Sequence, residues 1–201
     1  MAATRAQMME ETRAKLIAAA RKAFTEEGYA DTSMDDLTAA VGLTRGALYH
    51  NFGDKRGLLA AVVEEVDREM AAAAMAKAER KGGSAWDKLL AEGSAYIEAA
   101  RDPEISRIVL RDGPAVLGDP SHWPSQNACL AATMRSLETL AAQGAIKPIS
   151  IEAAARLLNG AALNAALWVA ASDAPDRVLN DAVTTFEQLA AGLLTEKDGI
   201  S

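Results

Sequence analysis

Two short helical patterns joined by a single turn lie within residues 33–52, and they constrain the fold more than any other part of the chain. The first pattern, MDDLTAAV, places its apolar residues on one helix face. The second, RGALYHNF, places Leu48 and Phe52 one turn apart. Gly42 separates the two patterns, and Thr44 has the side chain preferred at a helix N-terminus. Two short helices joined by a turn containing glycine predict a helix-turn-helix.

Longer helical patterns lie on both sides of this motif. A helix over about residues 9–27 is predicted before it, with Phe24 on its apolar face. This helix is expected to end at Gly28, since a C-terminal cap often needs a positive φ. After the motif, Asp54 can cap a fourth helix that reaches about Arg80. The first three helices are therefore expected to share one small core.

The rest of the chain continues as helical patterns separated by glycine and proline. Further helices are predicted at about residues 84–101, 105–111, 125–143, 151–172 and 174–194. Between residues 102 and 124, Asp-Pro, Gly-Pro and Trp-Pro pairs interrupt the pattern, so only ISRIVLR is predicted as helical there. Alanine dominates the apolar content, and alternating runs of β-branched residues are absent. The predicted fold class is all-α, with about nine helices.

The net charge of −7 is unevenly distributed along the chain. Residues 1–56 carry eight Lys or Arg and eight Asp or Glu, so the whole excess of negative charge lies in the remaining residues. An acidic protein ordinarily avoids nucleic acid. A neutral N-terminal part can still bind DNA if its positive charges face one way. A solvated surface without a polyanionic partner is the alternative that charge alone leaves open.

The residues that support enzymatic or metal chemistry are few. Cys129 is the one cysteine, so an intramolecular disulfide and a multi-cysteine metal site are excluded. His50 and His122 are the two histidines, and they lack metal-ligand spacing. No glycine-rich phosphate loop and no G-x-S-x-G motif is present. We therefore predict no enzymatic activity, no cofactor and no metal. A redox sensor that uses Cys129 between subunits is a weaker alternative.

The sequence has no apolar run that approaches the roughly 18 residues needed to cross a bilayer. The N-terminal stretch MAATRAQMMEETRAK lacks the apolar core of a secretory signal and leads directly into a helical pattern. A soluble protein of the cytoplasm, without a membrane partner, is the expectation.

Three linked motifs occur within residues 12–66. They are an alanine-rich helix ending in Phe-x-x-x-Gly-Tyr, a Thr-Ser pair, and the run Val-Gly-Leu-Thr-x-Gly-x-Leu-Tyr-x-x-Phe-x-x-Lys. This stretch closely resembles the N-terminal domain of TetR-type transcriptional repressors. The remaining three quarters of the chain match that family only in helix count and length. The resemblance implies a helix-turn-helix DNA-binding domain at residues 1–55 and a helical ligand-binding and dimerisation domain at residues 56–201.

The second helix of such a motif enters the major groove with its N-terminal residues at the base edges. Thr44 can donate a hydrogen bond to a phosphate there, where the helix dipole also favours an anion. Arg45 is the predicted base reader, because its forked donors match the acceptors of guanine. Gly46 keeps the helix surface low for a close approach to DNA. Asn51 departs from the family pattern, which often has an aromatic residue or histidine at that place.

Further contacts with DNA are predicted around this helix. Tyr49 lies on the same face as the base reader and can reach a phosphate or a thymine methyl group, and His50 can reach a phosphate. Lys55 resembles the phosphate-binding lysine of the family. Thr32 or Ser33 can hold a phosphate on the other strand. Each residue also has a plainer interpretation, such as a helix cap for Thr44 or packing for Tyr49.

The last two predicted helices are the expected dimer interface. Ala162, Ala165 and Ala166 permit close helix approach, and residues 174–194 carry a heptad-like apolar seam. In the resembling family these two helices form a four-helix dimer interface. A homodimer on a palindromic operator in double-stranded DNA is therefore predicted. Internal packing of both helices is the alternative.

The middle helices are expected to enclose a pocket for a small-molecule effector, because aromatic walls with a few polar groups suit such a site. The candidate ligand-binding residues are Tyr96, Arg107, Trp123, Asn127, Met134, Asn164 and Trp168. For each of them, ordinary packing or exposure is an equal alternative. The sequence does not identify the effector, and it favours an apolar or moderately polar molecule.

The predicted function is a ligand-responsive repressor that leaves its operator when the effector binds. The effector must then bind the DNA-incompetent arrangement more tightly than the competent one. The long fourth helix is the expected mechanical link, because it joins the two domains. An activator, and a helical ligand-binding protein without an operator, remain open as alternatives.

Overall fold

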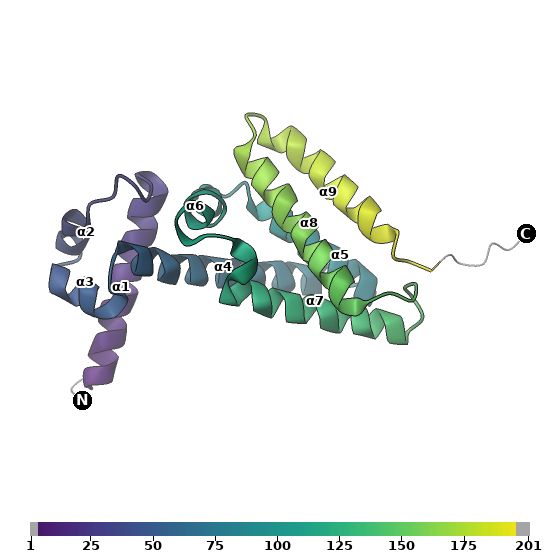
Figure 1. Cartoon of the computed structure of the whole chain (residues 1–201), viewed down its shortest axis with the longest axis horizontal. Helices are drawn as coiled ribbons and strands as arrows, with labels where there is room; N and C mark the ends of the chain where they lie inside the picture. Colours follow the sequence, from purple (N-terminus) through teal and green to yellow (C-terminus); the bar gives the residue numbers. More distant parts are fainter. Residues whose placement is uncertain (1–3, 196–201) are drawn as a thin grey trace, which may run out of the picture. The chain divides into compact units, whose positions relative to one another are not determined.

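The computed structural model of the protein describes residues 4–195 (Figure 1). The α-helices of this range are α1 (Arg5–Glu26), α2 (Met34–Ala40), α3 (Arg45–Phe52), α4 (Lys55–Lys81), α5 (Ala85–Ala99), α6 (Gly113–Leu117), α7 (Pro124–Ala142), α8 (Ile151–Ala171) and α9 (Pro175–Ala191). A π-helix, η1 (Ile105–Asp112), and a short 3₁₀ helix, η2 (Pro120–His122), complete them. The β structure in this range is one isolated bridge between Ile146 and Leu194. The all-α fold class is confirmed.

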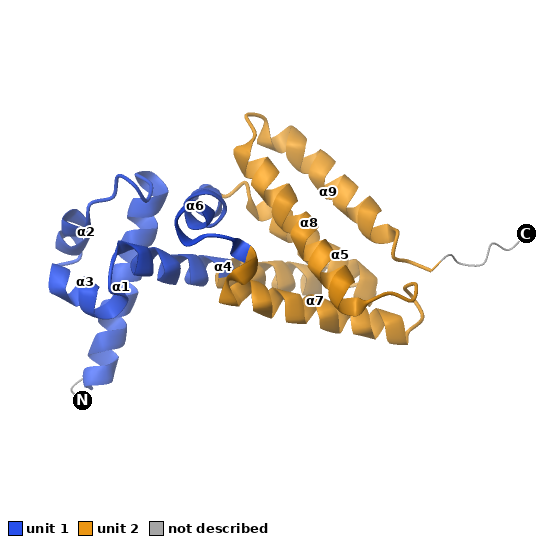
Figure 2. Cartoon of the chain, in the orientation of Figure 1, with its two compact units in different colours: residues 1–67, 103–120 blue, residues 68–102, 121–201 orange. Residues whose placement is uncertain are grey.

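The chain divides into two compact units (Figure 2). The N-terminal unit comprises residues 1–67 and 103–120, and the second unit comprises residues 68–102 and 121–201. The boundary runs through α4, so one continuous helix contributes to both units. The division predicted at residue 55 is a division by function and stays a prediction. The ends of those two predicted domains, residues 1–3 and 196–201, lie outside the described residues.

The first helix begins earlier than its apolar pattern indicates. Thr4 forms a capping box with Gln7, which supplies partners for two backbone N–H groups and starts α1 at Arg5. The helix ends as predicted at Gly28, whose φ of 91° is readily adopted only by glycine. Phe24 is completely buried, and its ring centroid lies 5.7 Å from that of Tyr29.

Side-chain caps start both helices of the helix-turn-helix, and the one at Thr44 is predicted from the sequence. The Ser33 hydroxyl accepts a hydrogen bond from the backbone N–H of Asp36 at 3.3 Å and caps α2. The Thr44 hydroxyl accepts one from the N–H of Ala47 at 3.2 Å and caps α3. Gly42 has a φ of 67° in the turn between them. These local hydrogen bonds fix where the exposed face of α3 begins.

Residues 103–120 correct the prediction that helical structure stops near residue 111. The π-helix continues to Asp112, and α6 follows directly. Pro114 does not prevent α6 because it lies in the first turn, where its missing N–H would have no helical partner. Pro114, which the sequence pattern indicates as a helix breaker, is therefore compatible with α6.

Polar side chains attach residues 103–120 to the N-terminal helices. The Arg21 guanidinium on α1 donates to both carboxylate oxygens of Glu104, at 2.9 and 2.7 Å. The same guanidinium donates to Glu65 of α4 at 3.1 Å. The Asp112 carboxylate accepts the backbone N–H of Tyr29 at 2.8 Å. The segment thus belongs to the N-terminal unit although it follows α5 in the sequence.

The second unit is built from α5, α7, α8 and α9 with the C-terminal part of α4. Helix α8 contacts α5, α7 and α9, and it lies beside α9 in Figure 1. Gly93 allows α5 and α9 to approach, because a Cβ atom there would lie 2.5 Å from the Phe186 ring. None of the described helices is long and apolar enough to cross a membrane.

Candidate functional site

One face of α3 is exposed, and it carries the side chains that the sequence predicts as DNA contacts. Thr44, Arg45, Gly46, Tyr49 and His50 are all exposed. Their spacing places them along the N-terminal and outer part of the helix, while Leu48 on the opposite side is completely buried. The structure therefore brings these five residues together on one surface.

Arg45 is held by two neighbours on this surface. Its guanidinium donates to both carboxylate oxygens of Asp35 at 3.2 Å, and to the Tyr49 hydroxyl at 3.1 Å. The hydrogen bond with Tyr49, followed by the charge of Asp35, raises the pKa of Arg45 further. The side chain is thus a permanent cation in a defined position. Because the ion pair is largely exposed, it can be exchanged for another acceptor at small cost.

Thr32 and Ser33, the two candidates for a phosphate on the other strand, have different surroundings. Thr32 is buried, and its hydroxyl donates to the Gly28 carbonyl at 2.7 Å. An enclosed hydroxyl that already donates is poorly placed to hold a phosphate, so the surroundings favour Ser33 over Thr32 for this predicted contact. Ser33 is partly exposed, and its hydroxyl proton is available because the oxygen acts as acceptor in the cap.

Lys55 lies at the start of α4, beside the loop between α1 and α2. Its ammonium donates to the Ala30 carbonyl at 3.2 Å and stands 4.6 Å from the Tyr29 ring centroid. Burial, followed by the charge of Asp54, raises the pKa of the Tyr29 phenol. An ammonium group has three donors, so this arrangement positions Lys55 and leaves donors for an anion.

Asn51 turns its amide into its own helix. The amide nitrogen donates to the Ala47 carbonyl at 2.7 Å, one turn earlier on α3. This side chain is part-buried. At this position, where the family pattern often has an aromatic residue or histidine, Asn51 therefore makes a hydrogen bond within the last turn of α3.

The second unit contains a cavity of about 420 Å³. Its wall consists of residues from α4, α5, α7, α8 and α9, all within that unit. Most of these residues are apolar, including Met75, Leu89 and Phe186. A volume of this size suits a small organic molecule, since ligand sites usually have roughly 300–1,000 Å³.

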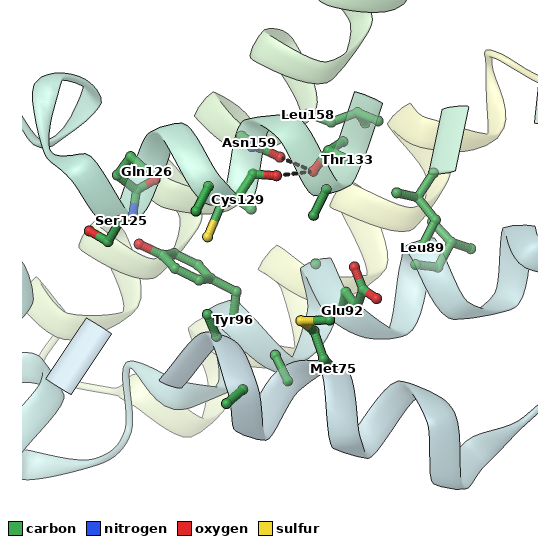
Figure 3. A pocket seen from close by; sticks show the side chains of 18 of the residues that line it. Met75, Leu89, Glu92, Tyr96, Ser125, Gln126, Cys129, Thr133, Leu158 and Asn159 are labelled. Carbon is green, nitrogen blue, oxygen red and sulfur yellow. Dashed lines mark hydrogen bonds between the residues drawn. The ribbon is translucent and has the colours of Figure 1, made fainter. Parts of the chain in front are cut away.

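A few polar side chains interrupt the apolar wall. Figure 3 shows Glu92 and Tyr96 of α5 on one side of the cavity, with Thr133 of α7 and Asn159 of α8 opposite. The Thr133 hydroxyl donates to the Asn159 side-chain oxygen at 2.9 Å. Burial is the main cause that raises the pKa of the Glu92 carboxyl. These groups are able to orient a ligand, together with the other polar side chains of the wall, which are Arg68, Ser125, Gln126 and Arg135.

The structure places one of the seven predicted ligand-binding residues, Tyr96, in the wall of this cavity. The other six are Arg107, Trp123, Asn127, Met134, Asn164 and Trp168, and they are not part of that wall. Arg107 lies in the N-terminal unit, where its guanidinium donates to the Glu27 carbonyl at 3.0 Å. Arg107 therefore lies in the other unit from this cavity.

The other five displaced residues lie in the second unit. Trp123 is buried at the start of α7, and Met134 packs against a core cluster of Leu137 and its neighbours. Asn127 is exposed on α7, and Asn164 and Trp168 are exposed on α8. The sequence does not determine which way each of these side chains points, because the packing of the helices decides it. In the folded unit these five residues do not line the cavity.

Sequence reasoning missed Glu92, Thr133 and Asn159. Glu92 had a usable signal, since it lies between Leu89 and Tyr96 on the apolar face of α5. A carboxylate on that face is unusual and could have been selected. Thr133 and Asn159 had no comparable signal, because both stand in alanine-rich helices whose orientation is set by packing.

An apolar row lies on the outer face of α8 and on α9. Leu157 is 75% exposed, Leu189 67% and Trp168 52%. A Cβ atom added at Gly160, on the same part of α8, would meet nothing within 4 Å. Helices α8 and α9 contact each other, and large exposed apolar side chains on neighbouring helices are typical of a surface that another protein covers.

Cys129 lies on α7 in the wall of the cavity and is half-buried. It is not part of the α8–α9 surface. In the part of the chain that the structure describes, no cluster of three or more His, Cys, Asp or Glu residues could hold a metal ion.

Two family models match the chain. The C-terminal domain described as tetracyclin repressor-like matches residues 86–193, and the family of bacterial regulatory proteins named after tetR matches residues 16–62. Among solved structures, a TetR-family transcriptional regulator from Pectobacterium atrosepticum is 48% identical. The match covers 96% of this chain and 99% of that one, with a TM-score of 0.87.

Curated relatives match over the N-terminal part. The transcriptional regulator TtgR of Pseudomonas putida is 40% identical over 57 residues, which are 28% of this chain and 27% of TtgR. The transcriptional repressor AcnR of Corynebacterium glutamicum is 38% identical over 60 residues, which are 30% of this chain and 32% of AcnR. The chain thus matches about a third or less of the length of these relatives.

Proposed function

The chain belongs to the TetR family of bacterial transcriptional regulators, and on this premise we propose that it is a repressor that leaves a palindromic operator when a small molecule binds. The family predicted from the N-terminal motifs is confirmed, and it is a family of regulators, not of enzymes. The observation that carries the proposal is the exposed row on α3, from Thr44 to His50. We place its action in the cytoplasm, where bacterial DNA lies.

In this proposal α3 enters the major groove with its N-terminus first. Arg45 exchanges the exposed carboxylate of Asp35 for the acceptors of a guanine, which its fork can contact in pairs. Tyr49 remains beside it and contacts a phosphate or a thymine methyl group. Thr44 and His50 contact phosphates, and Gly46 allows the backbone to come close.

Phosphate contacts outside α3 fix the position of the motif on the duplex. Lys55 is positioned by the Ala30 carbonyl and uses its remaining donors on a phosphate. Ser33 donates from the start of α2. Such contacts supply affinity and register but no sequence information, so discrimination depends on Arg45 and Tyr49.

A homodimer supplies the second half-site. The exposed apolar side chains Leu157, Trp168 and Leu189 support the predicted interface through α8 and α9. A two-fold axis there would match the surface of one protomer with the same surface of its partner. The two α3 helices would then read half-sites about one helical turn, roughly 34 Å, or a multiple of it apart.

The cavity of the second unit is the proposed effector site, and two segments connect it with the N-terminal unit. Helix α4 contributes Arg68 and Met75 to the cavity wall and starts at Lys55, beside the motif. The segment 103–120 belongs to the N-terminal unit but lies in sequence between α5 and α7, which both line the cavity. An effector that binds more tightly when α4 and residues 103–120 adopt a different orientation would stabilise that orientation. The separation of the two α3 helices in the dimer would then change.

The first experiment is selection of DNA by the purified protein from a random pool. A repressor of this kind enriches a palindromic motif whose half-site spacing matches the dimer. Binding to that motif should exceed binding to unrelated DNA by about a thousandfold or more at physiological salt.

Selection without an enriched motif would contradict the proposal. If no motif is enriched and binding is weak and falls steeply with salt, only the electrostatic attraction to phosphates is present. The protein would then be a helical ligand-binding protein without an operator. An enriched motif that lies where it assists polymerase binding would instead identify an activator.

A further inference from the structure

The carboxylate of Glu92 faces a cavity whose wall is mostly apolar. The residue is half-buried on α5, and Figure 3 shows its side chain beside Met75, with its carboxylate directed into the space below Thr133. A charged group in such surroundings is costly unless it has a partner. The question is which group supplies that partner.

Within the described residues the protein supplies no hydrogen bond and no ion pair to this carboxylate, although the charge of Lys88 lowers its pKa in part. Lys88 lies one turn before Glu92 on α5, where a lysine commonly pairs with a glutamate. Its ammonium instead contacts Glu79 of α4 at 2.8 Å. Glu92 makes no hydrogen bond and no ion pair with any residue in 4–195. Burial, followed by the charge of Glu79, accordingly raises the pKa of its carboxyl.

The opposite wall offers hydrogen-bond donors. The Thr133 hydroxyl lies within hydrogen-bond distance of the Asn159 side-chain oxygen, at 2.9 Å, and of the Cys129 carbonyl, at 3.1 Å, so its one proton is shared between them. With the Asn159 oxygen turned toward this hydroxyl, the amide nitrogen is the end left for another contact. That nitrogen makes no hydrogen bond with the described residues. The cavity thus has an acceptor that carries negative charge on α5 and a neutral donor on α8, with apolar surface between them.

Two arginines also line the cavity, and they define the competing class of ligand. Arg68 and Arg135 are both exposed, so water and salt screen their charges. A carboxylate ligand could meet them at the margin. It would then bring a second negative charge toward Glu92, whose charge is less screened because the residue is half-buried.

On the basis of the proposed function, we propose that the effector is a hydrophobic amine. Its apolar body fills the cavity, and its protonated nitrogen pairs with the Glu92 carboxylate. An ether, hydroxyl or carbonyl oxygen on the same molecule accepts from the Asn159 amide. Pairing the half-buried carboxylate with a cation removes the cost of leaving it without a partner. The charge of the ligand therefore decides which molecules bind, and the apolar wall supplies most of the affinity.

The test uses three probes that share a phenyl group on a four-carbon chain: phenylbutylamine, phenylbutanol and phenylbutyrate. Their binding to the full-length protein is measured by isothermal titration calorimetry. The amine should bind about tenfold more tightly than the alcohol, and the carboxylate most weakly. In Glu92→Gln, the amine should lose this advantage while the alcohol binds as before, which also shows that the cavity is intact.

Glu138→Gln is the matched control, because it removes the same charge from an exposed position on α7 outside the cavity. It should leave the preference for the amine unchanged. The proposal is overturned if the alcohol binds as tightly as the amine, if the carboxylate binds best, if no probe binds, or if Glu92→Gln keeps the preference. Loss of carboxylate binding in Arg68→Gln would then assign the cavity to anionic ligands.

Operator release is measured separately, so that the two proposals can fail separately. An amine that binds through Glu92 but leaves operator affinity unchanged contradicts the proposed release mechanism and supports the ligand class. Release by neutral or acidic molecules, with no effect of Glu92→Gln, contradicts the ligand class and supports the release mechanism.

Discussion

The two compact units differ in the side chains that fill their cores, although charged contacts join distant segments in both, Arg21–Glu104 in the first and Arg101–Asp176 in the second. In the N-terminal unit, Leu16, Phe24 and Leu48 are completely buried. In the second unit, the buried residues of α8 are four alanines and Val169. Small side chains let helices approach in some places and leave space where they diverge. The first unit is therefore suited to hold a fixed reading surface, and the second to enclose a ligand.

The largest expected effect comes from removing one phenylalanine in each unit. Phe24→Ala should lower the free energy of unfolding by about 3–5 kcal/mol, because the ring is completely buried. Phe186→Ala should cost clearly less, about 2 kcal/mol, because part of its ring already faces the cavity. Urea unfolding followed by circular dichroism measures both. Equal costs would mean that the second unit is packed as tightly as the first.

The next effect concerns the outer face of α8. Leu157→Glu should weaken the dimer by about 3 kcal/mol, because each dimer loses two buried leucines of about 1.5 kcal/mol each. Sedimentation velocity over a range of concentrations measures the dissociation constant. Asn127→Glu adds the same charge to an exposed site on α7 and should have no effect. A dimer unchanged by Leu157→Glu would exclude this face as the interface.

On the reading surface, Arg45→Ala should lower operator affinity by roughly tenfold to a hundredfold and relax the sequence preference at one base pair. Fluorescence anisotropy with the selected operator and single-base variants measures both quantities. Arg80→Ala removes the same charge from an exposed position in the second unit and serves as control. If affinity falls while the preference stays, Arg45 contacts a phosphate and another residue reads the base.

The smallest effect is expected from Asp35→Asn. Releasing Arg45 from its exposed carboxylate, and removing a charge that repels phosphate, should tighten operator binding by roughly twofold to fivefold. The gain should be smaller in the Arg45→Ala background, as a double-mutant cycle would measure. Weaker binding in Asp35→Asn would instead indicate that Asp35 holds Arg45 in the position that reads the base.

The sequence predicts local structure well where a short-range signal decides it. Ser33, Thr44 and Gly28 act within one turn of their own position, so their roles as caps are visible in the sequence. The same signals place the exposed face of α3, and with it most of the predicted DNA contacts. Thr32 is the exception, because its hydroxyl is buried in the turn that begins at Gly28.

The cavity was far less predictable from the sequence. Helix α8 has apolar residues on two faces, and only its packing against α5, α7 and α9 decides which face points inward. Asn159 lines the cavity, while Asn164, five residues later, faces outward. Arg107 could not be assigned to the N-terminal unit because the sequence does not show that residues 103–120 return to it. These features depend on tertiary contacts, which helix propensity does not determine.

The return of residues 103–120 limits how this protein can be recombined with its relatives. The chain crosses between the units after residues 67, 102 and 120, so no single cut separates them. A chimaera that takes only residues 1–67 from this protein would lose Glu104 and Asp112, which bind the Arg21 guanidinium and the Tyr29 backbone. Designers of biosensors who exchange operator specificity between regulators would therefore need to transfer both segments together.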